Sequence, residues 1–511
     1  MKKNAVFILF GLLMTFPVFS QTPEDALRNA WYIPGGSART LAVGGVMGSL
    51  GGDITAASVN PAGIGLYKTR EWVLSPAWMM NQNTADFRGT NSSQNKNAFG
   101  YGASGLVIGA PARPGSKWTS NAFSVSINQL ANFNNHIYYK GLNNYSSFSE
   151  QYLEELTRDN ADTNAALSNY IFGSSLAFRT YLIDTLNNAN GQMIGYKSLV
   201  PISTGVIQEM DQTTRGGYHE ISLAYASNMQ DKLYLGGSLN IPVVSYQRDL
   251  FYKESDATSN PNNNFSYFNY TEHFTSSGIG LGAKLGFIYR INDLLRMGFA
   301  VHTPSIIYFH DQIGSAMTTN TEGYAGTLSE SSANLNSGNP GDRTYNLLTP
   351  WRAILSGSYV FRDIEDTRLQ KGFLSADVEF VNYRGSRFSA TNQNDQTAID
   401  YYHALNQVVK SYYKPALNVR FGGELKFAPW MLRLGAAYYG SPYADKQLKA
   451  SRVLFAGGLG YRAYGFFVDL TYAYTMNTDV NFPYRLNDKA NTFAATKNNR
   501  GNILFTIGSK F

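Results

Sequence analysis

The feature that most constrains this 511-residue chain is an alternation of apolar and polar side chains that recurs from Glu71 onward. In Leu417–Phe427, every second position carries an apolar side chain or glycine, and the positions between are polar or glycine. A period of two is that of a β-strand with one apolar and one polar face. Fourteen such segments are predicted, starting near the following residues: Glu71, Tyr101, Asn121, Gly217, Lys232, Ser266, Leu295, Thr349, Lys371, Pro415, Met431, Arg452, Phe466 and Asn502.

Alternation alone also fits a sandwich with one buried face, so the lengths of the connections decide the fold. One set is short, as at Gln230–Asp231, and the other is mostly longer and rich in Asn, Ser, Thr and Gly. The long connections are predicted at these ranges: 81–99, 141–216, 255–264, 319–346, 384–414, 441–451 and 477–500. Short turns at one end and long loops at the other are typical of outer-membrane barrels. The sequence therefore predicts an all-β fold over 71–511, a transmembrane antiparallel β-barrel of about 14 strands, with loops 141–216 and 384–414 partly helical.

Composition agrees with a membrane barrel. Charged residues make up 15% of the chain, against roughly 25% in soluble domains. After residue 20 no run approaches the ~18 consecutive apolar residues of a spanning helix, and a membrane admits otherwise only closed barrels. The last predicted strand ends in aromatic Phe511, which resembles a signal for barrel-assembly machinery. We expect a multi-pass protein of the cell outer membrane, with membrane lipid and that machinery as partners. The charge of +6 includes no basic run and indicates no nucleic acid.

Residues 1–20 read as a secretory signal peptide. Lys2 and Lys3 precede the apolar stretch Ala5–Phe19, and Ser20 provides a small residue before a cut at Gln21. A buried strand or an anchor helix is the alternative.

Residues 21–70 do not alternate and are rich in glycine, so they predict short helices and tight turns. Asp53 is a suitable helix N-cap, and Pro61 would end a helix at or before Asn60. About fifty small residues bury little surface by themselves. We therefore expect this segment to fold as a plug in the barrel lumen.

The plug segment resembles the N-terminal hatch of the FadL/TodX family of outer-membrane transporters for hydrophobic compounds, in its Bacteroidetes-type branch. The resemblance rests on Ser37-Ala38-Arg39, Gly52-Asp53 and Asn60-Pro61-Ala62-Gly63, and on Phe299–Pro304 farther along. It implies a monomer that takes up apolar ligands passively, holds them near the plug and releases them sideways through the wall. On this reading Asn60, Pro61, Ala62 and Gly63 form the plug motif, and Asn60 orders the plug through backbone hydrogen bonds. The alternative is that Asn-Pro is only a turn signal.

The third segment contains a candidate kink. Its alternation stops at a polar stretch that includes Asn128, Gln129, Asn132 and Asn134. The resemblance implies a lateral opening at this strand, and these residues are the candidates for it. Equally, they fit the polar top of a strand that leaves the membrane.

Two loop segments carry apolar residues at helical spacing. The first includes Tyr170, Ile171, Phe178 and Tyr181, and the second runs over 401–412. A groove between them would suit capture of a hydrophobic ligand. Packing of loop against loop is the alternative.

No catalytic or metal-binding motif is found, so neither an enzyme nor a cofactor is expected. The six His have no H-E-x-x-H spacing, and G-x-S-x-G is absent. Asp159, Asp162 and Asn164 do not match a calcium loop. Charged residues on the predicted inner face indicate a structural ion-pair network: Asp377, Glu379, Arg420, Glu424, Lys426, Arg433 and Asp469.

Three function classes follow. The first is a channel for passive uptake of hydrophobic small molecules such as long-chain fatty acids or aromatic hydrocarbons. The second is a barrel of the same type that acts as a scaffold or shuttle in protein secretion, which the long second loop keeps open. The third, a lipid-directed enzyme, is disfavoured because no nucleophile constellation is found.

Overall fold

The computed structural model describes residues 22–113, 115–258, 260–362, 370–448 and 450–511. The predicted signal peptide lies outside the described residues. Among the helices that are described, none is long and apolar enough to cross a membrane.

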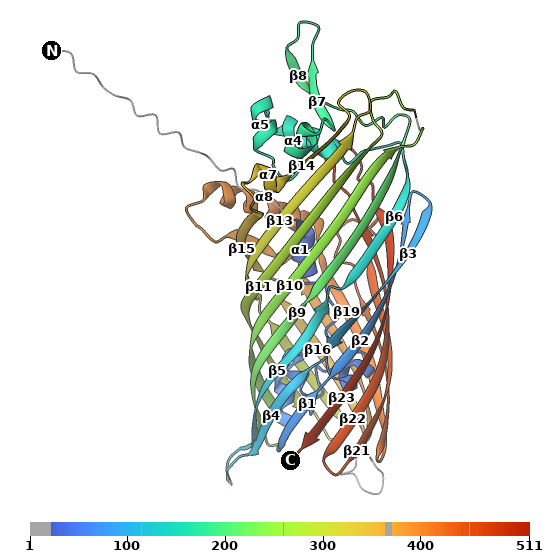
Figure 1. Ribbon diagram of the computed structural model, residues 1–511. Coiled ribbons are helices and arrows are strands. Elements are labelled where there is room, and N and C mark those ends of the chain that lie inside the picture. Colours follow the sequence, from blue (N-terminus) through green and yellow to red (C-terminus); the bar gives the residue numbers. More distant parts are fainter. Residues whose placement is uncertain (1–21, 114, 259, 363–369, 449) are drawn as a thin grey trace, which may run out of the picture.

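A closed antiparallel barrel of 14 wall strands dominates the molecule, as predicted (Figure 1). Several wall strands consist of two consecutive elements. In chain order the walls are β1 (Arg70–Leu74) with β2 (Pro76–Phe87), β3 (Thr90–Tyr101) with β4 (Ser104–Pro111), β5 (Trp118–Asn132) with β6 (Asn135–Asn143), β9 (Val206–Met229), β10 (Leu233–Asp256), β11 (Tyr267–Arg290), β12 (Leu295–His302) with β13 (Ile306–Asn320), β15 (Gly341–Leu348) with β16 (Arg352–Arg362), β17 (Gln370–Asn382) with β18 (Arg387–Ala390), β19 (Pro415–Phe427), β20 (Trp430–Tyr439), β21 (Ser451–Ala463), β22 (Phe466–Asn481) and β23 (Ala494–Lys510). The first and last walls pair, from Glu71 with Lys510 to Leu74 with Ile507, and close the sheet.

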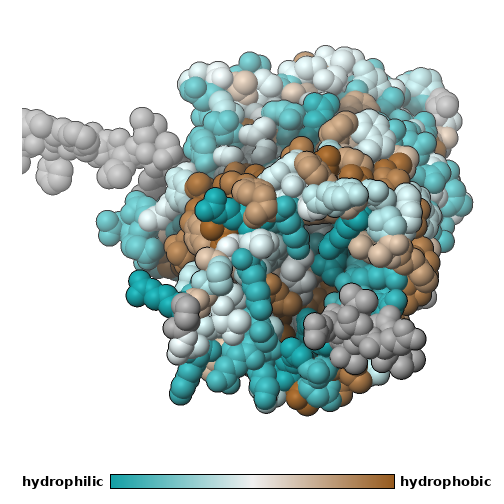
Figure 2. Space-filling view, turned by 90° about the horizontal axis from the view of Figure 1, so that it is seen from below, coloured by the Kyte–Doolittle hydropathy of each residue, from teal (hydrophilic) through white to brown (hydrophobic). Residues whose placement is uncertain are grey.

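The alternation in the sequence separates an outer apolar face from an inner polar one. On β19, Leu417 and Phe421 are 56% and 52% exposed, whereas Arg420 and Glu424 are 1% and 2% exposed. Outward apolar residues recur around the barrel and form the surface that faces lipid. Seen from the end with the short turns, the molecule presents mainly polar side chains, with apolar ones between and beside them (Figure 2).

Several predicted loops are wrong at their ends. The predicted loop 81–99 is a hairpin, in which β2 and β3 continue to a tight turn at Arg88 and Gly89, both with positive φ. The predicted loops 141–216 and 477–500 are shorter, because β6, β9, β22 and β23 extend into them. These strand ends rise beyond the apolar belt and carry polar residues on both faces, so composition alone does not distinguish them from loops.

Helices and a small hairpin lie above the barrel (Figure 1). The loop between β6 and β9 contains α4 (Glu150–Arg158), α5 (Thr163–Ser168), α6 (Ser174–Arg179) and the hairpin of β7 (Ile183–Asn187) and β8 (Met193–Ser198). The loop between β13 and β15 contains β14 (Thr327–Ser331) and α7 (Ser332–Leu335). The loop before β19 contains η2 (Tyr383–Gly385) and α8 (Gln396–Tyr412).

The first described segment runs down the lumen from α1, near the long loops, to the lower end of the barrel, and Pro23–Leu66 is called the plug below (Figure 1). It comprises α1 (Pro23–Arg28), α2 (Ala38–Ala42), α3 (Ala56–Val59) and the 3-10 helix η1 (Pro61–Leu66). Backbone groups bind the wall directly: Ala38 N donates to Thr506 Oγ1 at 2.8 Å, and Met47 N and Gly48 N donate to Asp377 Oδ2 at 3.1 Å. A Cβ at Gly298 of β12 would lie 2.0 Å from the Gly48 carbonyl oxygen, so only glycine permits this approach.

The predicted luminal ion pairs are confirmed. Arg433 bonds to Glu424 at 2.6 Å and to Asp469 at 2.5 Å, and Arg420 bonds to Glu379 at 2.6 Å. Arg39 of the plug joins this network through Glu424 at 3.2 Å. The pair of Arg39 and Glu424 thus fixes the plug to a buried, charged layer of the wall.

Candidate functional site

A cavity of about 700 Å³ lies between the plug and the extracellular loops. Its lining includes residues of α1, of the junction of β5 and β6, of β9 to β11, and of β22 and the loop that follows it. Many of its side chains are apolar or aromatic: Leu27, Trp31, Tyr32, Leu130, Phe133, Phe148, Tyr152, Phe172, Met210, Tyr246, Leu250, Tyr270, Phe482 and Tyr484. A pocket of this size and lining suits a small apolar molecule.

The loop above the cavity contributes its roof. Phe172 is buried, lines the cavity, and is held by its carbonyl oxygen, which accepts hydrogen bonds from Tyr270 Oη at 3.2 Å and Ser315 Oγ at 3.0 Å. Phe172 lies between the predicted helical positions, so helical spacing in the sequence does not indicate it. Its neighbour Ile171 packs with the same aromatic cluster.

The single helical stripe predicted in this loop is wrong. The chain forms two short helices, α5 and α6, because the backbone breaks over 169–173. Phe178 meets Tyr196 of β8, with ring centroids 5.8 Å apart, and the exposed Tyr181 meets Tyr324. Tyr170 Oη donates to Asp159. The first and third of these contacts lie within the loop between β6 and β9, and that of Tyr181 reaches the loop between β13 and β15, so the four candidate capture residues do not share one groove.

In α8, the buried residues also differ from the apolar stripe predicted over 401–412. Within α8 the buried residues are Ala398, Tyr402, Leu405 and Val409, while Val408 is 46% exposed. This face packs on residues of the plug and the upper wall. The helix therefore closes one side of the loop region.

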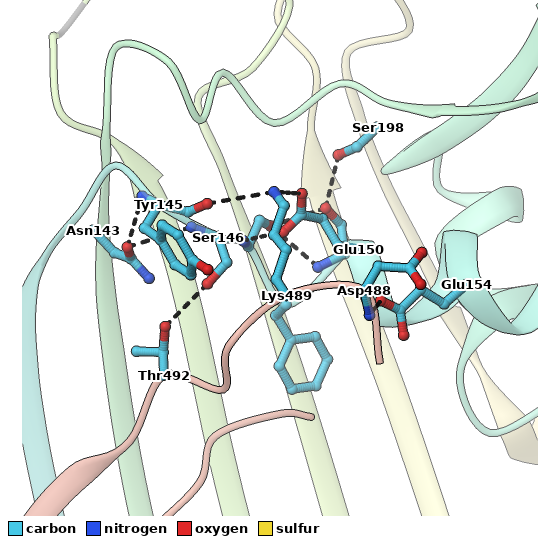
Figure 3. A network of polar contacts seen from close by, with 12 residues as sticks. Asn143, Tyr145, Ser146, Glu150, Glu154, Ser198, Asp488, Lys489 and Thr492 are labelled. Carbon is cyan, nitrogen blue, oxygen red and sulfur yellow. Dashed lines mark hydrogen bonds and ion pairs between the residues drawn. The ribbon is translucent and has the colours of Figure 1, made fainter. Parts of the chain in front are cut away.

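A polar network joins two extracellular loops (Figure 3). Lys489, from the loop between β22 and β23, bonds to Glu150 of α4 at 2.6 Å. Glu154 of the same helix accepts hydrogen bonds from the backbone N–H groups of Asn487 and Asp488 at 2.8 and 3.1 Å. The first loop of this pair contributes Phe172 and the second contributes Phe482 to the cavity, so the network holds two parts of its lining together.

Asn60 links two parts of the plug to each other and to the wall. It is fully buried, its Nδ2 donates to the carbonyl oxygens of Gly48 at 2.6 Å and Phe287 at 3.2 Å, and its Oδ1 accepts from Ala62 N at 3.1 Å. Pro61 starts η1, where its missing N–H costs no hydrogen bond. Gly63 packs so closely that a Cβ would lie 2.7 Å from the Leu50 carbonyl oxygen.

Asp53 is not the N-cap of a plug helix. Helix α3 begins at Ala56, and Thr55 occupies the N-cap position. The Asp53 carboxylate instead accepts hydrogen bonds from Thr55 N at 2.9 Å and from Ser37 Oγ at 2.6 Å. The residue thus joins the two turns of the plug that the sequence separates by sixteen positions.

The polar stretch of the third wall coincides with a break in the strand. The register between β5 and β9 shifts between Gln129 and Ala131, β5 ends at Asn132, and β6 begins at Asn135. Asn132 Oδ1 accepts from Asn134 N at 3.0 Å and so stabilises the bend. Asn128 is buried, and neither of its side-chain polar atoms has a hydrogen-bond partner.

The break lies beside an interruption in the wall. Pairing between β4 and β5 reaches Ser104 with Ile127 and goes no farther. Among the described strands, β3 then pairs with β2 alone, and β6 pairs with β9 alone. No backbone ladder therefore joins the second and third walls at the level of the cavity, whose lining includes Gln129, Asn132 and Asn135.

The direct path below the cavity is charged. Lys284 pairs with Glu220, and Arg352 and Arg420 pair with Glu379 at 3.6 and 2.6 Å, beneath the plug's Tyr32 and Pro34. An apolar molecule would have to displace these pairs to pass straight through, whereas the wall interruption lies at its side. Within the described residues, no group of three or more His, Cys, Asp or Glu is placed to hold a metal ion.

No protein-family model and no curated protein matches the sequence. Solved structures match over 94% of the chain. A Pseudomonas aeruginosa FadL homologue is 11% identical, with a TM-score of 0.55 and 99% of its own chain covered. The toluene transporters TbuX of Ralstonia pickettii and TodX of Pseudomonas putida are 14% and 12% identical, each with a TM-score of 0.50, with 99% and 100% of their chains covered. At these identities the likeness concerns the fold alone, and the chain shares the β-barrel fold of these solved structures.

Proposed function

We propose that this protein is an outer-membrane channel, and not an enzyme, for passive uptake of hydrophobic small molecules. Fatty acids and aromatic hydrocarbons are the two substrate classes in view. The observation that carries the proposal is the aromatic cavity of about 700 Å³ beside an interruption of the wall. The structural neighbours named as toluene transporters support it.

The route follows from where each surface lies. A ligand enters among the extracellular loops and transfers its apolar surface into the cavity, a gain of roughly 25 cal/mol per Å². The plug and the charged layer block the way down. The ligand leaves between β3 and β6 toward the outer leaflet, after a rearrangement of the plug and of the polar residues at the strand break.

Uptake in whole cells tests this proposal. A host that lacks its own channel of this type would express the wild type or Ala131→Trp, which places a large ring at the bulge that lines the cavity. We expect the wild type to speed uptake of labelled oleate or toluene and the variant to lose most of that gain. Tyr464→Trp, at a fully exposed turn, is the matched control. Equal uptake with and without the wild-type protein would contradict the proposal.

A second function, a scaffold or shuttle in protein secretion, is favoured by one observation. The hairpin of β7 and β8 stands clear of the barrel, and its Ile194 is 62% exposed (Figure 1). A stoichiometric protein partner retained through purification from native membranes, and lost on deletion of 184–197, would support this alternative. A protein that purifies alone as a monomer with a bound apolar molecule would support the channel.

A further inference from the structure

The outer face of the barrel carries cations directly beyond its apolar belt on the wall of β17 and β18. The outward apolar residues of this wall end at Phe380, whose ring packs on that of Trp351 from the preceding wall, with centroids 5.2 Å apart. Paired aromatic rings at such a position mark the edge of the belt. The next exposed residues along the chain are Arg384 of η2 and Arg387 of β18. They lie at the level of the lipid headgroups.

Two lysines of the adjoining segment add to these arginines. Helix α8 lies against η2 and β18 at the side of the upper barrel, and it exposes Lys410 (Figure 1, left). Lys414 is partly exposed and lies between α8 and β19. Arg384, Arg387, Lys410 and Lys414 are called the cationic edge below. In the part of the chain that the structure describes, none of them forms an ion pair.

The acidic groups of the same segments do not neutralise the cationic edge. Asp395, at the start of α8, lies 3.7 Å from Arg343. Two exposed carboxylates accept hydrogen bonds from glutamine donors at 2.8 Å: Asp400 from Gln396 Nε2, and Asp445 from Gln447 N. Even with both of these carboxylates counted, the four cations leave an excess of positive charge.

Other walls differ on their outer faces. There, residues beyond the apolar belt include acid–base pairs, with His273 bonded to Asp249 and His310 to Asp342, each at 2.6 Å. These pairs match each basic side chain with an acidic one. The unpaired cations beside α8 are therefore a local feature and not a property of the whole rim.

The cationic edge lies on both sides of a junction in the upper wall. Among the described strands, β18 pairs with β15 alone. At its other edge, Phe388 N donates to Asn406 Oδ1 of α8, and Asn406 Nδ2 donates to the Phe388 carbonyl oxygen, both at 2.8 Å. A helix side chain thus takes the place of a strand partner. The arginines belong to the wall side of this junction, and the lysines belong to the helix side.

We propose that the cationic edge binds the phosphate group of a lipid in the outer leaflet, whose acyl chains lie along Trp351, Phe380 and the exposed Leu417 of β19. Arginine binds phosphate through two parallel charge-assisted hydrogen bonds, and lysine binds it as a point charge. Apolar contact below the headgroup adds to this affinity. A phosphate held from both sides ties α8 to the wall. The proposal is independent of the proposed function, because it concerns the outer face and not the cavity.

Lipid A, a phosphorylated glycolipid, is the probe. Protein purified in detergent is titrated with lipid A and with its dephosphorylated form, and bound lipid is counted by native mass spectrometry. We expect the wild type to bind lipid A about tenfold more tightly, and Arg384→Gln/Arg387→Gln to lose this preference. Arg384→Lys/Arg387→Lys keeps the charge but not the planar fork and should retain part of it. Excess inorganic phosphate should not displace lipid A, since it lacks acyl chains.

A matched control removes the same charge elsewhere. Arg215→Gln/Lys497→Gln changes two exposed cations on the outer faces of β9 and β23, and it should leave the preference for lipid A unchanged. Heat-modifiable migration shows that each variant has folded.

Crosslinking tests where the lipid lies. The chain has no Cys, so a single thiol reports one position. Ser389→Cys places it on the outer face of β18 beside Arg387, and Ser277→Cys places it on the outer face of β11. Each is labelled with a benzophenone maleimide and irradiated with lipid A. We expect lipid adducts at position 389 and few at 277, and adding Arg384→Gln/Arg387→Gln should remove them.

Hydrogen exchange tests the tie between helix and wall. Lipid A should slow exchange over 396–412 in the wild type and not in Arg384→Gln/Arg387→Gln. Unchanged exchange in the wild type would overturn this tie.

The remaining outcomes decide the site itself. Equal binding of lipid A and its dephosphorylated form to the wild type, binding of neither, or equal adducts at positions 389 and 277 would overturn it. Displacement by inorganic phosphate would overturn the lipid as the occupant. Arg384→Gln/Arg387→Gln should leave uptake of oleate or toluene unchanged, so failure of this site and failure of the proposed function are distinguishable.

Discussion

Asn60 of the plug lies directly against Gly286 of β11. A Cβ at position 286 would be 2.0 Å from Asn60 Oδ1, and Asn60 Nδ2 reaches past it to the carbonyl oxygen of the next residue, Phe287. The polar side chain of the plug motif and the bare backbone of the wall are therefore two halves of one contact.

We expect Gly286→Ala to displace the plug at this contact. The methyl group overlaps Asn60 and costs about 1–3 kcal/mol, and Asn60→Ala, which leaves the carbonyl oxygens of Gly48 and Phe287 without their donor, costs a similar amount. Urea unfolding followed by heat-modifiable migration measures both. Gly357→Ala, at a wall glycine with open space around it, is the control and should be near neutral. The same loss in all three variants would contradict a specific contact.

Phe172→Ala should weaken binding of a neutral apolar probe. The ring forms part of the cavity roof, and its loss exposes the site to water. We expect about a tenfold rise in the Kd of dodecanol, or 1.4 kcal/mol. Phe178→Ala removes the same ring from the same loop at a position that faces Tyr196, outside the cavity lining. That variant should bind within twofold of the wild type, and an equal effect of both would place the roof elsewhere.

Reversing the charges of Lys489 and Glu150 one at a time should change the contact between the two loops without changing the global stability of the protein. Lys489→Glu leaves two acidic groups together at a partly exposed site, where the pair contributes at most about 1 kcal/mol. We expect an unchanged urea midpoint but faster hydrogen exchange over 485–492. Adding Glu150→Lys should restore slow exchange. Exchange that stays fast in the double variant would show that the other bonds of Figure 3 dominate.

The loop region should lose stability as pH rises. Burial raises the pKa of Glu155 in α4 above its usual 4.5, and Ser174 Oγ donates to its carboxyl group at 2.5 Å. Because the folded loop holds this proton more tightly than the unfolded loop, the stabilisation is complete below 4.5 and is lost as pH rises through the folded value. Protease resistance of the loop should fall over that range in the wild type and stay level in Glu155→Gln. A wild type that gains resistance instead would contradict the sign.

The barrel was predictable because lipid and lumen impose one rule on every strand. Leu417 to Phe427 shows that rule in five consecutive pairs, and fourteen segments of this kind match fourteen walls. Strand ends were not predictable from composition, since Gln82 to Asp86 pair with Asn91 to Asn95 in a hairpin whose residues are mostly polar on both faces.

The site was predictable only where it is local in sequence. The polar stretch from Asn128 to Asn134 disturbs the alternation, and that disturbance marks the break in β5. The cavity itself combines Trp31, Phe148, Phe172 and Tyr246 from the plug, a loop and a wall strand. No periodicity links these positions, because their proximity depends on barrel closure. The hydrogen bond between Asn83 and Asn498 has the same character, since these residues meet through pairing of the first and last walls.

That pairing also sets an order of events in time. The plug leads directly into β1, and β1 can find its closing partner only once β23 has been made. The earliest part of the described chain therefore waits longest for its final surroundings. This segment is rich in glycine and small residues, and its larger apolar side chains are spread among them, which limits aggregation while it waits in water. The plug's composition thus suits the delay before closure as well as the tight fit that follows it.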